Sequence, residues 1–198
     1  ETKRFAMAGW LPAMLQTTIA VHELTHALQD QYFNLKEFTD EKKYNGDELL
    51  ARSALVEGDA TAVMLDYARR LVGQQPLAKE PDVEAVMMQN VIGASMTSGM
   101  GNVPPSLQLM LIFPYTSGLR FAHVGLQRNG YRELDKMFRK PPRSTEEILH
   151  PEKYLQSTPD FISIAAETLA SDDFATGTAP VYRDVIGEFA TSVLLGNF

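Results

Sequence analysis

The 198-residue chain contains no cysteine. Disulfide bonds and thiolate metal sites are therefore excluded, and the redox state of its compartment stays open. Basic residues are in the minority, because 18 Lys and Arg stand against 25 Asp and Glu and the formal net charge is -7. An acidic chain without a basic cluster is not expected to bind nucleic acid or an anionic membrane as its main partner.

Long apolar runs are also missing. No stretch of about 18 uninterrupted apolar residues occurs, so no membrane-spanning segment is expected. The chain starts with Glu1 and shows no signal-peptide pattern. This start indicates an excised piece of a longer protein, or a mature product whose signal peptide has been removed. The localisation stays undetermined, and a secreted or periplasmic location is compatible with the sequence.

Histidine is scarce, and two of the four histidines fall in one motif, His22-Glu23-Leu24-Thr25-His26. Helical residues four apart lie one above the other, so both imidazoles can face one metal ion with Glu23 beside it. Zinc (Zn2+) suits two neutral imidazoles, one carboxylate and a water. The motif arises by chance in about 0.5% of chains of this length. The alternative is a helix whose histidines meet only neighbouring carboxylates.

A third zinc ligand is expected from a second helix, over residues 47–72. The metzincin pattern is excluded because Gln29 and Tyr32 occupy the positions of its Gly and His. Within the second helix Glu57 is the preferred ligand, since its neighbours one turn away are all small and let another helix come close. Those neighbours are Ser53, Ala54, Ala60 and Thr61. Asp59 and Asp66 are weaker candidates, and an ordinary surface or ion-paired Glu57 is the alternative.

The HELTHA stretch, followed some thirty residues later by an EGDA helix, resembles the gluzincin zinc metallopeptidases, which include the thermolysin-like enzymes. FPYTSG (113–118) and PPRSTEEILHPEKY (141–154) are similar to blocks in uncharacterised bacterial proteins assigned to the metallopeptidases. The resemblance implies His22, His26 and Glu57 as zinc ligands and Glu23 as general base. The aspartate that orients a ligand histidine in thermolysin-like enzymes is replaced here by Thr61.

Two features of this family pattern stay open. The acceptor that holds the imidazoles in their tautomers could be Asp59, Asp30 or a backbone carbonyl. Gluzincin domains also place a sheet before the motif helix, and its edge strand pairs with the substrate. Only about twenty residues precede His22, so the sheet belongs to an upstream segment or the substrate is held in another way.

A further donor is expected to stabilise the oxyanion that forms during hydrolysis. Tyr115 and His123 are the leading candidates, because Tyr115 lies at a predicted turn and His123 lies on a polar helical face. Arg120 and His150 are the other candidates. The alternative is that this polar stripe is only the solvated side of a helix.

The pattern as a whole predicts a mainly α fold, a single helical domain over residues 1–198 built round the motif helix and the Glu57 helix, with little or no β-sheet. The expected helices are 8–36, 47–72, 82–97, 116–128, 131–139, a short one capped by Ser144 and Glu147, and 181–195. Residues 107–113 could be strand or helix, and the segment after Pro159 is ambiguous. The methionines of 87–100 are either core filler or part of a mobile lid.

The expected function is zinc-dependent hydrolysis of a peptide or protein substrate, in which zinc and Glu23 activate a water. The first alternative is a zinc-stabilised helical binding or structural module without peptidase activity. The second is a metal-free helical interaction domain.

Overall fold

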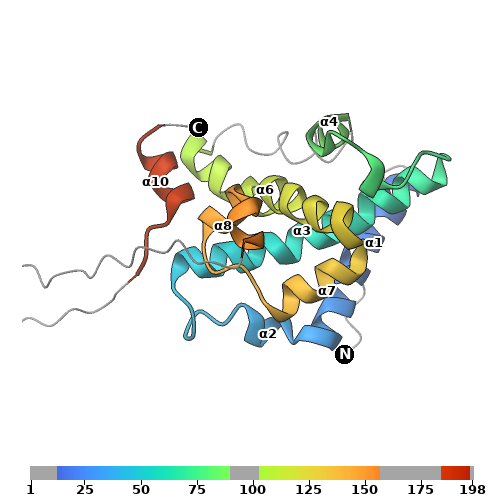
Figure 1. Cartoon of the computed structure of the whole chain (residues 1–198). Helices are drawn as coiled ribbons and strands as arrows, with labels where there is room; N and C mark the ends of the chain where they lie inside the picture. The colour runs from blue at the N-terminus through green and yellow to red at the C-terminus, as the bar shows by residue number, and fades with distance from the viewer. Residues whose placement is uncertain (1–12, 90–102, 157–183, 197–198) are drawn as a thin grey trace, which may run out of the picture.

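A computed structural model describes residues 13–89, 103–156 and 184–196, and every regular element in these ranges is a helix (Figure 1). The prediction of a mainly α fold with little or no sheet is confirmed for these residues. The long helices are α1 (Ala13–Phe33), α3 (Gly46–Leu71) and α6 (Pro105–Asn129). The short elements are α2 (Leu35–Phe38), the 3-10 helix η1 (Leu77–Lys79), α4 (Val83–Gln89), α7 (Tyr131–Arg139), α8 (Thr145–Leu149), α9 (Pro151–Leu155) and α10 (Glu188–Leu194). Within the described ranges, no helix combines the length and apolar character needed to cross a bilayer.

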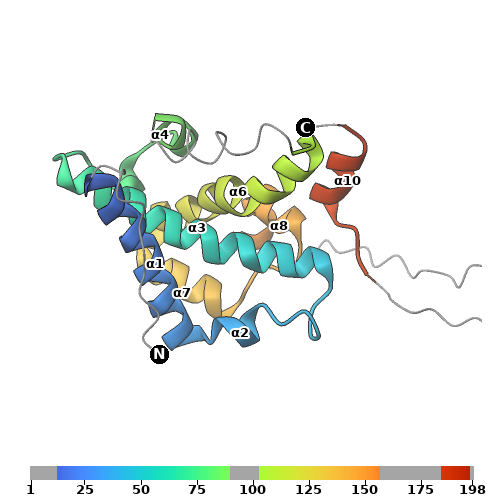
Figure 2. The same ribbon diagram turned by 180° about the vertical axis from the view of Figure 1, so that it is seen from behind.

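Helix α3 is the centre of the fold. The Asn45 side chain caps its first turn by accepting a hydrogen bond from the N–H of Glu48 at 3.0 Å. Acidic residues in the first turn and Arg69 and Arg70 in the last turn complement the helix dipole. Helix α1 crosses α3, and α6 runs alongside α3 (Figures 1 and 2). All three long helices therefore meet near the middle of α3.

Two glycines let α3 and α6 come into backbone contact. A Cβ at Gly58 would overlap the carbonyl of Gly118, and a Cβ at Gly118 would overlap the carbonyl oxygen of Ala54. Any larger residue at either position would push the two helices apart, because the neighbouring atoms are backbone and cannot rotate away. This close approach fixes the position of Tyr115 on α6, three residues before Gly118, relative to Glu57 on α3, the residue before Gly58.

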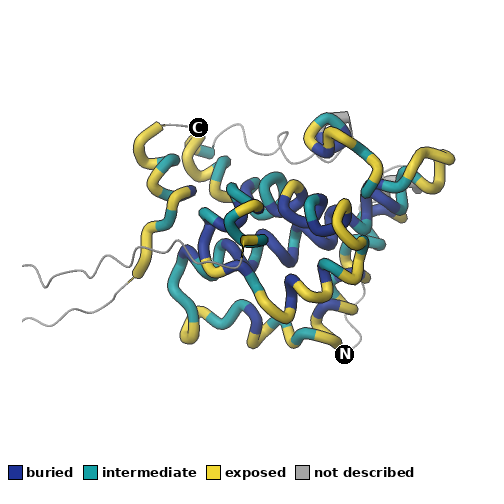
Figure 3. Tube along the Cα trace, in the orientation of Figure 1, coloured by how far each residue is buried: buried dark blue, intermediate teal, exposed yellow. Residues whose placement is uncertain are grey.

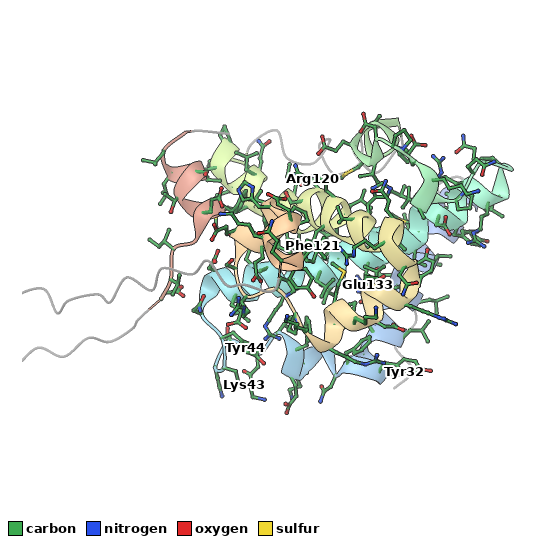
Figure 4. All side chains as sticks on the ribbon, in the orientation of Figure 1. Tyr32, Lys43, Tyr44, Arg120, Phe121 and Glu133 are labelled. Atoms are coloured by element: carbon green, nitrogen blue, oxygen red, sulfur yellow. The ribbon has the colours of Figure 1, made fainter. Side chains whose placement is uncertain are left out.

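The core runs along the facing sides of α3 and α6 (Figure 3). Phe121 is fully buried among the packed helices, whereas Tyr32 stands on the outside of α1 with 76% of its surface exposed (Figure 4). Phe113 of α6 stacks on Phe189 of α10 with ring centroids 3.9 Å apart. This stacking attaches the C-terminal helix to the body formed by the long helices.

One helix replaces two predicted elements in the middle of the chain. Residues 107–113 and 116–128 are parts of the continuous helix α6, which passes through Pro114. Proline removes one hydrogen bond from a helix interior and normally ends or kinks it. Here Phe113 is buried before the proline and Gly118 and Leu119 after it, so packing against α3 keeps both halves in one helix. The Thr116 hydroxyl also donates to the carbonyl of Ile112 at 3.1 Å, within the same turn.

Other boundaries differ less. Helix α7 has the predicted bounds, and Ser144 caps α8 by accepting from the N–H of Glu147. The Glu147 carboxylate bonds to the N–H of Arg143 rather than to that of Ser144, so the capping box is only half formed. The final helix begins at Glu188 instead of residue 181. Within the predicted helix 82–97, residues 83–89 are helical and Met87 is buried. Residues 90–102, which include most of the methionine segment, lie outside the described residues, and so do residues 157–183.

Candidate metal centre

Three potential ligand atoms converge where α1 crosses α3. His22 and His26 lie one turn apart on α1, and their Nε2 atoms are 3.0 Å apart. Glu57 Oε2 on α3 lies 3.2 Å from Nε2 of His22 and 3.3 Å from Nε2 of His26. Among the described residues, this is the one group of His, Cys, Asp or Glu side chains whose ligand atoms lie close enough together to share an ion.

The spacing of these atoms fits a tetrahedral ion. Zinc bonds of about 2.0–2.2 Å place the ligand atoms of a tetrahedron about 3.3–3.6 Å apart. The three separations in the structure are 3.0–3.3 Å. The atoms therefore form one face of such a tetrahedron after movements of a few tenths of an ångström, and the fourth corner is left for a ligand from outside the protein.

One oxygen of the Glu57 carboxylate lies against two imidazoles without forming a regular hydrogen bond. Its Oε2 is buried and accepts no hydrogen bond from any described residue, although two ring nitrogens lie within 3.3 Å. Those nitrogens can share a proton with each other, but neither is directed at this oxygen with hydrogen-bond geometry. A buried oxygen without a partner costs about 1–3 kcal/mol, and a bound cation would remove that cost.

The charges at the site favour the ligand form of Glu57. Burial alone would raise the pKa of Glu57, but the imidazoles of His22 and His26 outweigh burial and lower that pKa to about 2. Burial lowers the pKa of His26, but interactions with Glu57 and Gln29 more than offset this effect, so the pKa is raised overall. Glu57 is therefore an anion at neutral pH, as a metal ligand must be.

Gln29 holds the far side of the His26 ring. It is 3% exposed, and its Oε1 accepts a hydrogen bond from Nδ1 of His26 at 2.8 Å. Its Nε2 donates to Asp59 Oδ2 at 2.8 Å and to the carbonyl of Val56 at 3.1 Å. Asp59, Asp30 and a backbone carbonyl were predicted as possible acceptors, and Gln29 was not among them. The spacing of Gln29, three residues after His26 on the same helical face, was the available signal.

Neither of the two aspartates predicted as acceptors bonds directly to a ligand histidine. Asp30 accepts from the N–H of Leu35 at 3.0 Å and so helps to end α1. Asp59 reaches His26 only through Gln29, and its burial raises its pKa to about 6. Asp66, a weaker candidate for the third ligand, accepts from the N–H of Leu77 at 2.7 Å and pairs with Arg70, so it does not reach the imidazoles.

Glu23 and Tyr115 both lie beside the three candidate ligands. Glu23 follows His22 on α1 and is exposed to solvent. The Tyr115 ring on α6 stacks beside the His22 ring with centroids 6.3 Å apart. Burial raises the pKa of the Tyr115 phenol, and the nearby charges of Glu57 and Glu23 raise it further. Tyr115 therefore keeps its proton at neutral pH and can donate a hydrogen bond.

The other predicted donors are not brought to this group. His123 is buried, and its Nε2 bonds to the carbonyl of Leu77 at 2.9 Å, eight residues or about 12 Å of helix beyond Tyr115. Arg120, on the upper side of α6 in Figure 4, donates to the carbonyl of Leu149 at 2.8 Å. His150 lies 2.8 Å from the Glu188 carboxylate. His123, Arg120 and His150 thus serve packing between helices, and we assign none of them a role at the candidate site.

The chain was also compared with known proteins. The comparison with protein-family models, with curated proteins and with solved structures gives no match.

Proposed function

We propose that this chain is a zinc-dependent peptide hydrolase of the gluzincin type, with His22, His26 and Glu57 as metal ligands. The observation that carries the proposal is the convergence of two imidazole nitrogens and Glu57 Oε2, an oxygen that makes no regular hydrogen bond to a described residue, to within 3.0–3.3 Å. The resemblance of the HELTHA stretch to gluzincin enzymes supports the choice of zinc. The geometry by itself would suit other ions that prefer nitrogen and carboxylate ligands.

The number of ligands favours catalysis over a purely structural role. Structural zinc sites are usually closed by four protein ligands, whereas catalytic sites use three and leave a position open. The described residues supply three. The side chains of His22, His26 and Glu57 are 12%, 21% and 23% exposed, so the group is not fully enclosed by the protein.

Zinc at this position would act as a Lewis acid and would lower the pKa of a water toward neutrality. The Glu23 carboxylate accepts a proton from the attacking water and later delivers it to the leaving amine. The Tyr115 hydroxyl donates a hydrogen bond to the oxyanion that forms from the peptide carbonyl. Gln29 keeps Nδ1 of His26 occupied as a donor, so that Nε2 can present its lone pair.

The alternative of a zinc-stabilised module without activity keeps one supporting observation. The described residues contain no strand whose edge could pair with an extended substrate. This alternative predicts that zinc raises the melting temperature while no peptide is cut.

The direct test is elemental analysis of the purified chain together with hydrolysis of casein and of a mixed peptide library. We expect about one zinc ion per chain, and hydrolysis that a chelator abolishes and added zinc restores, because each catalytic group depends on the ion. A chain that takes up zinc but cuts no substrate would support the structural alternative. A chain that takes up no metal would contradict both proposals.

Replacing Tyr115 with phenylalanine tests the oxyanion donor. We expect the kcat to fall by about 10²–10³-fold, as for other single oxyanion donors, with zinc content unchanged. The matched control is Tyr67→Phe, which removes a hydroxyl from a half-buried residue of α3 and should keep normal kcat. A normal kcat in Tyr115→Phe would show that Tyr115 only packs against His22.

A further inference from the structure

We infer that Gln29 and Asp59 form a positioning relay that selects the metal-binding tautomer of His26. The inference rests on the proposed metal centre and adds residues that the HExxH motif and the third ligand do not include. The relay consists of one hydrogen bond within α1, from His26 to Gln29 at 2.8 Å, and two that join Gln29 to Val56 and Asp59 of α3 at 3.1 and 2.8 Å.

The orientation of the Gln29 amide follows from its neighbours. One end of the amide faces both the Val56 carbonyl and the Asp59 carboxylate. A carbonyl can only accept, so this end must be the NH2 group, which has two protons to donate. The Val56 carbonyl requires a donor at this position even when Asp59 is protonated. The oxygen of the amide is therefore left to face His26.

The tautomer of His26 follows in turn. Gln29 Oε1 can only accept a hydrogen bond, so Nδ1 of His26 must carry the proton that it donates. A neutral imidazole protonated at Nδ1 has its lone pair at Nε2, and this nitrogen is the one that lies 3.3 Å from Glu57 Oε2. The relay thus prepares His26 for metal before any ion arrives.

Asp59 holds the Gln29 amide on the side away from His26. Its carboxylate takes the second proton of the Gln29 amide, and it is largely buried, so the pair does not exchange freely with water. His22 has no comparable partner, because its Nδ1 is buried without a hydrogen bond to any described residue. The relay therefore orients one of the two imidazoles, and it acts through His26 without touching a substrate.

The Gln29→Leu variant tests the relay through metal affinity. We expect the dissociation constant for zinc, measured by competition with a chromophoric chelator, to rise about 10–100-fold, the usual cost of losing a group that orients a ligand. Asp59→Asn keeps a side-chain oxygen that can accept from the Gln29 amide, and the Val56 carbonyl is unchanged. This variant should therefore bind zinc within a few-fold of wild type.

Two controls separate positioning from ordinary stability. Gln31→Leu removes an exposed amide from the same helix and should leave zinc affinity unchanged. The melting temperature of each metal-free variant is measured as well. If the network only joins two helices, Gln29→Leu lowers the melting temperature while the folded protein binds zinc as tightly as wild type. That result would overturn the relay.

A measurement on the unmutated protein gives an independent answer if the variants fold poorly. Long-range proton–nitrogen NMR spectra of the metal-free chain, recorded at a pH where both rings are neutral, report which ring nitrogen carries the proton. We expect Nδ1 of His26 to be protonated, and a proton on Nε2 would overturn the relay. If the wild-type protein binds no zinc, both the relay and the proposed function are contradicted. If Gln29→Leu binds zinc as tightly as wild type, only the relay is contradicted.

Discussion

Replacing Glu23 with glutamine is expected to lower the rate of peptide hydrolysis by about 10²–10⁴-fold, the usual contribution of a general base. Glutamine has nearly the same shape but cannot accept a proton from water at neutral pH. Glu23 is exposed on α1 and is not one of the three converging ligands. The variant should therefore keep its fold and bind one zinc ion per chain, as measured by elemental analysis beside the casein assay.

The matched control for this variant is Glu41→Gln, which removes the same charge from an exposed residue between α2 and α3. Its activity should equal that of wild type, because the effect expected at position 23 is chemical and not a change of net charge. Equal activity in wild type and Glu23→Gln would remove Glu23 from the mechanism. Loss of zinc in Glu23→Gln would instead show that Glu23 helps to hold the ion.

Replacing Glu57 with glutamine is expected to weaken zinc binding strongly, because the site loses its one anionic ligand. At a free zinc concentration about 1,000 times the dissociation constant, bound metal stabilises the folded state by about 4.1 kcal/mol. If affinity falls about 100-fold, the same zinc concentration stabilises the variant by only about 1.4 kcal/mol. For a chain of this size, the loss lowers the zinc-induced rise in melting temperature by about 5–11 °C.

The measurement compares melting temperatures with zinc and with a chelator, for wild type and for Glu57→Gln. Glu41→Gln again serves as the control and should show the wild-type zinc effect. Equal zinc effects in wild type and Glu57→Gln would show that the ion binds elsewhere, and the gluzincin-type centre would then be rejected. A chain whose melting temperature is insensitive to both zinc and chelator would favour the metal-free alternative.

Local rules accounted for much of the helical structure. The bounds predicted for α7 match the structure, and those of α3 differ by one residue at each end. Helix α3 is marked by its capping residue Asn45, and α7 by Gly130 before it and by Pro141 and Pro142 soon after its end. Prediction was wrong around Pro114, because residues 107–113 and 116–128 were expected as separate elements with Tyr115 at a turn, and they form one helix. The burial of Phe113 and the contact at Gly118 hold α6 together there, and neither can be seen in a local window of sequence.

The residues proposed as donors to the oxyanion show the same limit. Tyr115 and His123 were equal candidates from sequence, since both are polar residues near the same helix. The structure separates them, because Tyr115 lies against His22 while His123 bonds to Leu77, 46 residues earlier in the chain. That difference depends on how α6 is rotated against α3 and η1, which only long-range packing can set.

The sequence by itself determined the spacing of His22 and His26, because an uninterrupted helix places residues four apart on one face whatever surrounds it. It also directed attention to Glu57 through its small neighbours. The tertiary structure alone decided that α1 crosses α3 at Glu57, that Gly58 and Gly118 bring Tyr115 beside the site, and that Gln29 and Asp59 hold His26 from behind. These contacts join residues distant in sequence, and their geometry depends on side-chain packing across helices rather than on the period of any one helix.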